Sequence, residues 1–518
     1  MKILTATQMR RVEEECTKLG ILTSTLMENA GREFATQMRR ILGSVKDKTI
    51  LFLIGPGNNG GDGLVAARYV HRWGAKVSLC LFGNRALDDP LMAFAAEQSV
   101  SVTLTNKDKN LKKLEELLSE ADAVVDAVFG TGMNRPLTGV YSEALNRLNQ
   151  SKKANPSLTV IALDLPSGLN ADSGACDPAC PFADETITLG FPKPGLFNLP
   201  AAERVGRITI VDIGIPSHLV NEITDEYLER EEIKSLLPKR PSFANKGYFG
   251  RVLVVAGSER YLGAPYLACS AAMRSGAGLV TLAIAKSLHP ILASKLTEVT
   301  FLPLPESKTG LIPDNALDII LEEIKRYDAL LVGCGLGQAK EAWDFLKGLI
   351  PILNNSDKKI VLDADALNFL AEVPEWWQRL SIDAILTPHP GEMARLTGLT
   401  ADGVQQDRIN LSRKMAARWH KTVILKGAYT VIASPEGRIR VSPFANPGLA
   451  SAGTGDVLAG VVSGMLAQGL ELFDAATLGV YLHGEAGEMV RENIGNTGMI
   501  ASDLLPVLPL VIKKLRGD

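Results

Sequence analysis

Short runs of buried-type residues alternate with helical stretches along this 518-residue chain. In the first half, such runs lie at 49–55, 76–83, 123–130, 158–168 and 207–214. Parallel strands need long crossover connections, which are usually helices, so this alternation predicts a parallel sheet with both faces covered. The chain is therefore expected to be of the α/β class.

The alternation is interrupted once. Residues 225–250 are charged, contain two prolines and show no strand pattern, which is typical of a domain junction. Strand-like runs then resume at 251–258, 278–285, 329–337, 359–367, 383–392 and 422–434. We therefore predict two different α/β domains, at residues 1–224 and 241–518, with a linker at 225–240.

Composition limits the possible partners. Apolar residues make up 46% and charged residues 22%, as in an ordinary globular protein, and the formal charge of −3 gives no electrostatic case for nucleic acid or a membrane surface. The N-terminal stretch resembles neither a signal peptide nor an anchor. The six cysteines fit reduced thiols of a cytoplasmic protein better than a metal site at Cys176 and Cys180.

The second half contains GTGD, Gly453 to Asp456, directly before the apolar helical pattern VLAGVVSGMLAQ. Glycines at a helix start leave backbone N–H groups open toward a ligand, and the helix dipole favours an anion there. A carboxylate in the same turn can take a proton from a hydroxyl held beside a phosphoryl group. Taken alone, the motif fits an ordinary helix start with an Asp cap equally well.

Three other predicted strand ends carry related motifs: DADAL (363–367), LTPHPGEMARL (386–396) and LKGAYTVI (425–432). Together with GTGD, and in this order, these segments resemble the ribokinase-like fold, whose kinases have a similar glycine-rich anion hole and an aspartate base. The resemblance implies a ribokinase-like α/β domain in the second half.

A narrower resemblance rests on KGYFGRVLVVAGSERYLGAPYLACSAAMRSGAGLVTLA (246–283), GCGLG, LTPHPGE, KGAYT and GTGDVLAG. These segments resemble the dehydratase half of the NAD(P)H-hydrate repair enzymes. That resemblance implies binding of ADP (ATP in eukaryotic members, with Mg²⁺ as a possible companion) and of the S form of hydrated NADH or NADPH, called NADHX and NADPHX. One departure is Cys334, where many relatives have proline, and a changed local turn is expected there.

The resemblance also implies roles for individual residues. Asp456 would be catalytic, removing the hydroxyl proton of the hydrate while the GTG amides hold the incoming phosphoryl group, so that the domain acts as a lyase. Asp456 would contact the hydrate together with Gly337, His389, Pro390, Gly391, Glu392, Met393, Ala394 and Arg395. The ADP-binding residues would be Lys426, Gly427, Ala428, Tyr429, Thr430, Asn446, Pro447, Gly448, Leu449, Ala450, Ser451, Ala452, Gly453, Thr454 and Gly455.

In the first half, GPGNNGGDGLVAARYV (55–70) follows a predicted strand and opens a helix. It fits neither the dinucleotide spacing nor a P-loop. Its glycines allow a ligand phosphate to approach the backbone, but a lone turn of this kind is more often structural than functional. Further strand-end motifs are VDAVFGTGMNRPLTG (125–139), ALDLPSGLNADSG (162–174) and TLGFPKPG (188–195). The set resembles the epimerase domain of the same repair system over nearly all of 1–220, which implies a Rossmann-like three-layer domain.

This second resemblance implies an isomerase site. Asp164 would be catalytic, transferring the proton that interconverts the two epimers. A potassium ion would be held by Asn59, Asp126 and Ser167, whose hard oxygen atoms suit it, although a hydrogen-bond network would use the same residue types. The hydrate-binding residues would be Asn58, Asn59, Gly60, Gly61, Asp62, Gly130, Thr131, Gly132, Met133, Asn134, Arg135, Pro136 and Asp164.

Joined, the two domains predict a bifunctional repair enzyme, because a dehydratase that accepts only the S form would leave the R form unrecovered. The expected partners are NADHX, NADPHX, ADP and further copies of the chain in a homo-oligomer, without nucleic acid or membrane. Two other classes stay open at this point. One is a small-molecule kinase, for example of a vitamin alcohol, with a nucleotide-binding regulatory N-terminal domain. The other is a non-catalytic nucleotide-responsive module in the first half.

Overall fold

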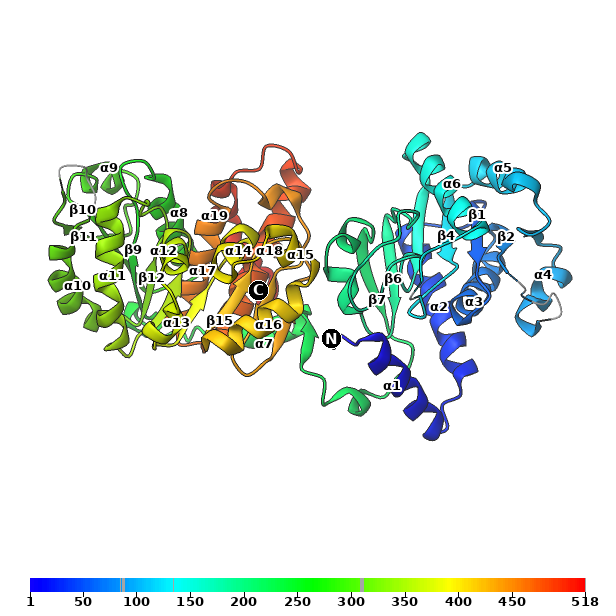
Figure 1. Cartoon of the computed structure of the whole chain (residues 1–518), viewed down its shortest axis with the longest axis horizontal. Coiled ribbons are helices and arrows are strands. Elements are labelled where there is room, and N and C mark those ends of the chain that lie inside the picture. Colours follow the sequence, from blue (N-terminus) through cyan, green and yellow to red (C-terminus); the bar gives the residue numbers. More distant parts are fainter. Residues whose placement is uncertain (84, 86–88, 134, 308–311, 518) are drawn as a thin grey trace. The chain divides into compact units, whose positions relative to one another are not determined.

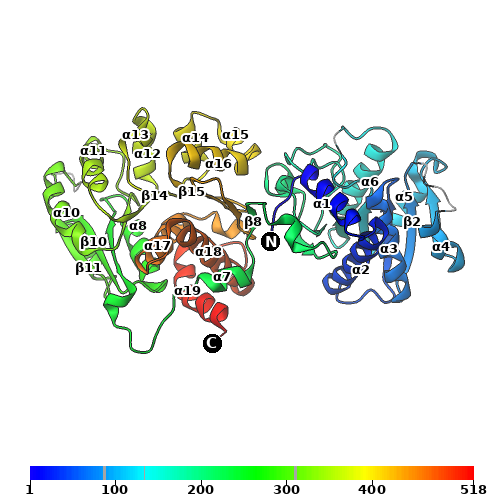
Figure 2. The ribbon, with the colours of Figure 1, turned by 90° about the horizontal axis from the view of Figure 1, so that it is seen from below.

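The computed structural model describes residues 1–83, 85, 89–133, 135–307 and 312–517. The chain divides into two compact units, Met1–Thr224 and Asp225–Asp518, and each unit consists of a sheet with helices packed on it (Figures 1 and 2). Within these described ranges, no helix is long and apolar enough to cross a membrane.

The sheet of the first unit has, among the described residues, seven parallel strands in the order β3-β2-β1-β4-β5-β6-β7. The strands are β1 (Thr49–Ile54), β2 (Lys76–Leu81), β3 (Ser101–Leu104), β4 (Ala123–Ala127), β5 (Thr159–Leu163), β6 (Glu185–Leu189) and β7 (Arg207–Val211). The strand order reverses between β1 and β4. In open α/β sheets, ligands bind at the carboxyl ends of the strands at such a switch point.

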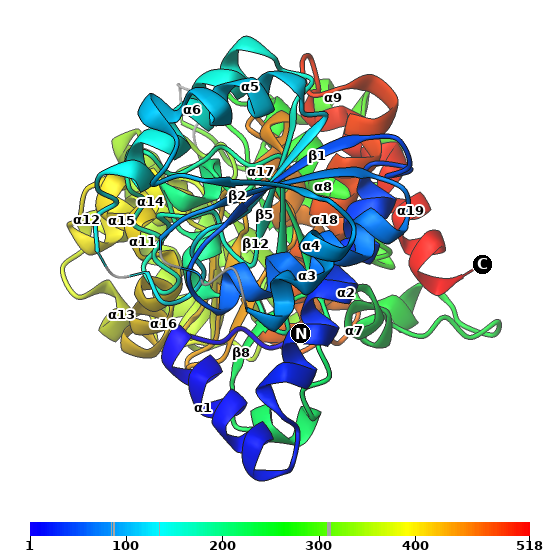
Figure 3. The ribbon, with the colours of Figure 1, turned by 90° about the vertical axis from the view of Figure 1, so that its right-hand side faces the viewer.

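Helices cover both faces of this sheet (Figure 3). Ile50, Phe52 and Ile54 of β1 belong to the core that includes α2 and α3, whereas Leu51 and Leu53 pack in the core with α5 and α6, because successive side chains of a strand point to opposite faces. The helices are α1 (Ala6–Lys18), α2 (Thr23–Ile41), α3 (Asn58–Arg72), α4 (Ala93–Glu97), α5 (Lys112–Glu120) and α6 (Val140–Ala154). The predicted Rossmann-like three-layer fold is confirmed.

The second unit has a larger sheet, in which the described residues form ten strands in the order β11-β10-β9-β12-β13-β14-β15-β16-β17-β8. All neighbours are parallel except at β16, which runs antiparallel to β15 and β17. The strands are β8 (Asp225–Tyr227), β9 (Arg251–Val255), β10 (Leu279–Ala285), β11 (Thr300–Leu304), β12 (Ala329–Val332), β13 (Lys359–Leu362), β14 (Ala384–Leu386), β15 (Thr422–Leu425), β16 (Val431–Ala433) and β17 (Ile439–Val441). The strand order reverses between β9 and β12.

Helices again lie on both faces of this sheet, with α11, α12, α14 and α16 on one side and α8, α17, α18 and α19 on the other (Figure 2). The helices are α7 (Arg230–Leu236), α8 (Gly263–Arg274), α9 (His289–Ala293), α10 (Leu317–Glu323), α11 (Lys340–Asn354), α12 (Asp365–Glu372), α13 (Trp376–Arg379), α14 (Pro390–Thr397), α15 (Ala401–Gln406), α16 (Arg408–Trp419), α17 (Thr454–Ala467), α18 (Leu472–Ile494) and α19 (Ala501–Arg516).

Residues 225–240, expected to form a linker, are instead part of the second unit. They contain β8, which pairs in parallel with β17, and α7. Arg413 donates a hydrogen bond to the Asp225 carboxylate over 2.6 Å and so ties β8 to α16. A strand of three residues has no periodicity of its own, and its extended form depends on the neighbouring strand that pairs with it.

Candidate active sites

The first candidate site lies at the switch point of the first unit. The turn after β1 leads directly into α3, and its glycines allow it to lie against the end of β4. A side chain on Gly55 would overlap the Val128 carbonyl, and one on Gly60 would overlap the Gly55 carbonyl. The first turn of α3 is therefore held close to β4, where its open N–H groups can meet a ligand.

A cavity of about 430 Å³ opens at this switch point. The predicted hydrate-binding residues that line it are Asn58, Asn59, Asp62, Gly130, Thr131, Gly132, Met133 and Asp164. Gly60 and Gly61 are buried in the first turn of α3, and Arg135 and Pro136 lie further along the loop after β4. Asn134 lies outside the described residues.

Asp126 and Ser167 form a buried hydrogen-bonded pair. Ser167 Oγ donates to Asp126 Oδ1 over 2.6 Å, and the Ser167 N–H donates to Oδ2 over 2.7 Å. Burial raises the pKa of Asp126, although these hydrogen bonds oppose the shift. Asn59 lies near the same segment, 128–130, since a side chain on Gly130 would be 3.0 Å from Asn59 Oδ1. Among the described residues, the buried Nδ2 of Asn59 has no hydrogen-bond partner.

Asp164 lines the cavity in a left-handed backbone conformation, with φ at 67°, which is uncommon for a residue with a side chain and frequent at functional sites. Its Oδ1 accepts a hydrogen bond from Lys193 Nζ over 2.5 Å. Lys193 is only 1% exposed and lines the same cavity. The sequence contains this lysine in TLGFPKPG, but a lone lysine in a loop shows no pattern that separates it from a surface residue.

Two more carboxyl groups face this cavity. Burial raises the pKa of Asp62 well above its ordinary range, and the negative charges of Asp164 and Glu13 add to this effect. Glu13 comes from α1, and burial raises its pKa as well. The sequence did not single out Glu13, because the surrounding helix reads as a charged, solvated face. The cavity therefore holds an ion pair beside carboxyl groups that favour the neutral form.

The second candidate site lies at the carboxyl ends of β13, β14 and β15. Lys426 Nζ lies 2.8 Å from Asp363 Oδ1 and 3.6 Å from Glu392 Oε2. Thr387 Oγ1 donates to the same Asp363 oxygen over 2.7 Å. Burial raises the pKa of Glu392 to about 7. For Lys426, burial disfavours the charge, but the two carboxylates outweigh it and raise the pKa above the usual value.

Asp456 lies in the first turn of α17, next to this ion pair. A side chain on Gly455 would come within 3.4 Å of Lys426 Nζ, so the GTGD and KGAYT turns are neighbours, as the expected chemistry requires. Burial, followed by the charge of Asp363, raises the pKa of Asp456 to about 6, although the Cys334 thiol and Lys426 lower it. Such a value suits a group that exchanges protons near neutral pH.

The start of α17 has an open backbone. Gly453, with φ at 89°, precedes the helix, and a side chain there would lie 2.5 Å from Leu267 Cδ1. Thr454 Oγ1 donates to two carbonyl groups of the preceding loop, while its own carbonyl is bonded to His483 Nε2 over 2.9 Å. In the described residues no side chain caps α17. Asp456 therefore does not cap the helix, and the N–H groups at the start of α17 are available to bind an anion.

The KGAYT turn, 426–430, is held from within the unit. Gly427 and Tyr429 have φ values of 138° and 52°, and Thr430 Oγ1 donates to the Gly427 carbonyl over 2.9 Å. The buried guanidinium group of Arg408 donates to the two carbonyl groups that enter the turn, over 2.9 and 3.3 Å. The turn therefore has a fixed backbone beside Asp456.

The predicted ADP-binding residues 446–455 form one loop that leads through the short helix η9 (Pro447–Leu449) into α17. Asn446 Oδ1 accepts the Gly448 N–H over 2.9 Å, and Ser451 Oγ donates to the Met499 carbonyl over 2.8 Å. The Nδ2 of Asn446 is buried and has no partner in the described part of the chain. These hydrogen bonds hold the loop in place, and, within the described residues, the Asn446 Nδ2 group is free to donate a hydrogen bond to a ligand.

The predicted hydrate-binding segment 389–395 forms the start of α14. His389 Nδ1 accepts the Glu392 N–H over 3.3 Å, and Glu392 Oε2 accepts the His389 N–H over 2.7 Å, which is a capping box with histidine as its first residue. Burial lowers the pKa of His389 and so favours the neutral form that can accept. Met393 is fully buried, so its side chain packs into the core.

Gly337 and Arg395 are linked through α12. The Gly337 N–H donates to Asp365 Oδ2 over 2.8 Å, Asn368 Nδ2 donates to Asp365 Oδ1 over 3.3 Å, and Arg395 Nε donates to Asn368 Oδ1 over 3.0 Å. Asp365 and Asn368, for which no role was predicted, therefore connect Gly337 to Arg395 by hydrogen bonds.

Cys334 lies beside the two central carboxylates. Its Sγ is 3.9 Å from Asp363 Oδ2, and Sγ and the nearest oxygens of Asp363 and Asp456 all lie within 4.8 Å of one another. Burial, followed by these negative charges, raises the pKa of the thiol well above its usual value. The departure from the family pattern therefore places a neutral thiol next to the expected base.

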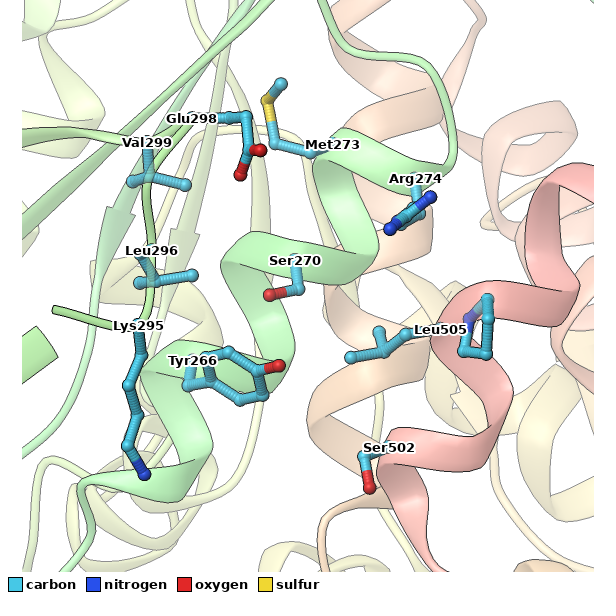
Figure 4. A pocket seen from close by; sticks show the side chains of 11 residues that line it. Tyr266, Ser270, Met273, Arg274, Lys295, Leu296, Glu298, Val299, Ser502 and Leu505 are labelled. Carbon is cyan, nitrogen blue, oxygen red and sulfur yellow. The ribbon is translucent and has the colours of Figure 1, made fainter. Parts of the chain in front are cut away.

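A further cavity, of about 510 Å³, lies between α8, the segment 295–299 and the start of α19 (Figure 4). Tyr266 and Ser270 line it from α8, and Ser502 and Leu505 from α19. Its described lining contains none of the residues predicted from the sequence, which gather instead at the strand ends.

Sequence comparisons match both halves. The family profile described as NAD(P)H-hydrate dehydratase matches residues 252–510, and that described as YjeF-related protein N-terminus matches 23–195. The chain is 39% identical to the bifunctional NAD(P)H-hydrate repair enzyme Nnr of Moorella thermoacetica, over 100% of this chain and 98% of that protein. It is 33% identical to the protein of the same name from Escherichia coli K12, over 98% and 93%.

Structural comparisons agree with the fold. A ribokinase-like superfamily protein from Enterococcus faecalis V583 is 25% identical with a TM-score of 0.50, over 57% of this chain and 98% of that one. An ADP/ATP-dependent NAD(P)H-hydrate dehydratase from Bacillus subtilis, co-crystallised with ATP and Mg²⁺, is 32% identical with a TM-score of 0.49, over 56% and 98%. The likeness to the Enterococcus faecalis protein confirms the predicted ribokinase-like domain. Since relatives of one name match the chain from end to end, it belongs to the family of bifunctional NAD(P)H-hydrate repair enzymes.

Proposed function

We propose that the first unit interconverts the R and S forms of NADHX and NADPHX, and that the second unit dehydrates the S form with ADP. The observation that carries the second activity is Asp456, a half-buried carboxylate with a raised pKa, placed beside Lys426 at the uncapped start of α17. Family membership supports the pairing of the two activities.

In the dehydratase site, Asp456 takes the proton of the hydrate's ring hydroxyl while the hydroxyl oxygen attacks the terminal phosphorus of the nucleotide. The N–H groups at the start of α17 hold the transferred phosphoryl oxygens, and Lys426 balances their charge. The ring nitrogen then expels the phosphate with its bonding electron pair. The departing phosphate takes the proton of the neighbouring ring carbon, which regenerates the dihydropyridine.

The nucleotide contacts the KGAYT turn and the loop 446–455 in this proposal. The buried Nδ2 of Asn446, which has no partner among the residues that the structure describes, supports it, because a buried donor without a partner is rare and fits a missing acceptor. ADP is the proposed donor, with ATP as an alternative. Asp363 Oδ1 already accepts from Lys426 and Thr387, and the Cys334 thiol is a poor magnesium ligand. Magnesium would thus be bound mainly by the nucleotide phosphates.

In the epimerase site, Asp164 takes the hydroxyl proton at C6, a carbon that carries both a hydroxyl group and the ring nitrogen. The C6–N bond then breaks with its electron pair on nitrogen, which leaves an aldehyde. After rotation the nitrogen attacks the other face of the carbonyl, and Asp164 returns the proton. No atom is gained or lost, as an isomerase requires.

Asn59, Asp126 and Ser167 would hold a potassium ion in this site. The residues fit it, because Asn59 Oδ1 and Ser167 Oγ both lie at the segment 128–130, and the Asp126 carboxylate is bonded to Ser167. These are hard oxygen atoms, which suit such a cation. The ion would supply positive charge for the binding of an anionic cofactor.

Mixed R and S hydrates supplied with ADP test both activities in one experiment. Return of the full reduced-nicotinamide absorbance, with one AMP and one phosphate formed for each molecule repaired, is the expected result. Recovery of only the S fraction would contradict the epimerase proposal. A phosphorylated product that accumulates without recovery would show a kinase instead, and a parallel reaction with ATP ranks the two nucleotides.

A further inference from the structure

Lys193 is a buried lysine in the epimerase cavity, in the segment between β6 and the short helix η3 (Pro194–Phe197). A buried ammonium group is unfavourable unless it is paired and hydrogen-bonded. Its Nζ lies 2.5 Å from Asp164 Oδ1, 3.2 Å from Thr188 Oγ1 and 3.2 Å from the Leu189 carbonyl. An ammonium group has three donors, so all of them are used within the protein and Lys193 has none left for substrate.

The partner carboxylate is bound on one side only. Asp164 Oδ1 accepts from Lys193, from Thr188 Oγ1 over 3.1 Å and from the Leu189 N–H over 3.1 Å. Within the residues that the structure describes, no group donates a hydrogen bond to Oδ2. Because Asp164 lines the cavity, Oδ2 is the oxygen available to a ligand there.

The backbone of Asp164 needs such support. Its φ of 67° is unfavourable for a residue with a side chain, and strained conformations persist only where neighbouring contacts fix them. The three hydrogen bonds to Oδ1 fix the side chain and thereby the strained residue that carries it.

Several charged groups surround the Asp164 carboxylate, and Lys193 is in direct contact with it. Asp164 acts on the two carboxyl groups Glu13 of α1 and Asp62 of α3, and the cations that act on these two are Lys193, Arg10 of α1 and Arg85 of the loop after β2. Arg85 is already paired with Asp89 over 2.7 Å. Burial raises the pKa values of Asp62 and Glu13, so these two carboxyl groups next to the Asp164–Lys193 pair hold their protons more readily than exposed ones.

We propose that Lys193 is a positioning residue of the epimerase, which holds Asp164 ionised through Oδ1 so that Oδ2 can exchange the substrate's hydroxyl proton. This inference rests on the proposed epimerase function. It assigns Lys193 no contact with the substrate and no transferred proton.

The test compares Lys193→Met with Lys152→Met in the full-length chain. Lys152 is a matched control, because it also pairs with an aspartate, Asp184, over 2.8 Å and donates to backbone carbonyls, but it does not line the cavity. Epimerisation of R-NADPHX is followed against pH. Lys193→Met should lower kcat roughly 10²-fold, the range of one proton-transfer group, with little change in KM.

The same variant should move the acidic limb of the rate profile to higher pH, because a carboxylate without its cation is protonated more easily. A purely structural role would lower activity without moving that limb. Lys152→Met should keep both the rate and the profile of the wild type. A Lys193→Met enzyme with the wild-type rate and profile would overturn the inference.

Thr188→Val covers the case in which Lys193→Met does not fold. It removes one hydrogen bond to Asp164 Oδ1 and keeps the cation, so kcat should fall several-fold while the acidic limb stays in place. Wild-type kcat in this variant would also overturn the inference. If the wild-type chain itself shows no epimerisation, the failure lies in the proposed function and not in the role of Lys193.

Discussion

Lys426 Nζ and Asp363 Oδ1 lie 2.8 Å apart, although the two residues are 63 positions apart in the sequence. The pair joins the carboxyl ends of β15 and β13 and acts on Asp456 in both directions, since Asp363 raises the pKa of that carboxyl and Lys426 lowers it. The proposed base is therefore tuned by a contact between strand ends.

Asp456→Asn should lower the dehydratase rate roughly 10²- to 10⁴-fold, because the amide cannot take the hydroxyl proton. The measurement is NADPH return from S-NADPHX with ADP, with nucleotide affinity determined by calorimetry. Epimerisation by the same chain is the internal control and should not change. Dehydration near the wild-type rate with unchanged ADP affinity would exclude Asp456 as the base.

The dehydratase should lose activity as the pH falls through about 6. The carboxylate of Asp456 is the active form, and burial together with Asp363 raises its pKa to about 6, so the ionised fraction falls below that pH. The acidic limb of kcat/KM measures this for the free enzyme. A limb that stays near pH 4, the ordinary range of an aspartate, would contradict the assignment.

Asp456→Asn should also stabilise the second unit at pH 8, by about 1–3 kcal/mol. The folded-state pKa is raised, so keeping this carboxylate ionised in the fold is unfavourable above about pH 6. The difference should shrink between about pH 6 and pH 4, as the folded wild type takes up its proton. Thermal unfolding at several pH values checks this, and a constant difference would argue against a buried ionised Asp456.

Gly453→Ala should reduce dehydration at least about tenfold and destabilise the unit by more than Gly469→Ala. Both glycines have positive φ, 89° and 95°, so each substitution brings backbone strain of about 1 kcal/mol. Only Gly453 is crowded, by Leu267 Cδ1 at 2.5 Å, whereas a side chain on Gly469 meets nothing within 4 Å. Equal losses in denaturant unfolding and in activity would show that crowding at the start of α17 is unimportant.

Ser167→Ala should raise the potassium concentration needed for half-maximal epimerisation, roughly tenfold or more, as for loss of other groups that support a bound metal. Rates are measured against KCl with choline chloride holding ionic strength constant. Ser173→Ala, on an exposed serine bonded to Asn170 Oδ1, is the control. A wild-type epimerisation rate that does not depend on the potassium concentration would contradict the proposed ion site.

The sequence predicted the central strands well, because strands buried on both faces appear as continuous apolar runs. It did not reveal β3, β6, β8, β11 or β17, which have three to five residues each. Such strands owe their extended form to pairing with neighbours. Each contains polar residues or proline (SVTL, ETITL, DEY, TFLPL and IRV), so none of them appears as a continuous apolar run.

The candidate sites divide in a similar way. GTGD, KGAYT and the motif around Asn59 are local, and a family resemblance could place them. Asp363 lay in the strand-end motif DADAL, but no role was predicted for it. Lys193 and Glu13 had no such signal, because single charged residues in loops or on a helix face look alike in a sequence. Their importance comes from partners that lie far away along the chain, such as Asp164 for Lys193, 29 residues earlier.

By itself, the sequence determined the alternation of the central strands with helices and the glycine-rich turns that begin α3 and α17, since both depend on the spacing of apolar residues and on residues next to one another. Only the tertiary structure decided which strand ends meet, and with them the Asp164–Lys193 and Asp363–Lys426 pairs. It also decided the pKa of Asp456, because burial and the charges around a carboxyl group depend on chain segments distant in sequence.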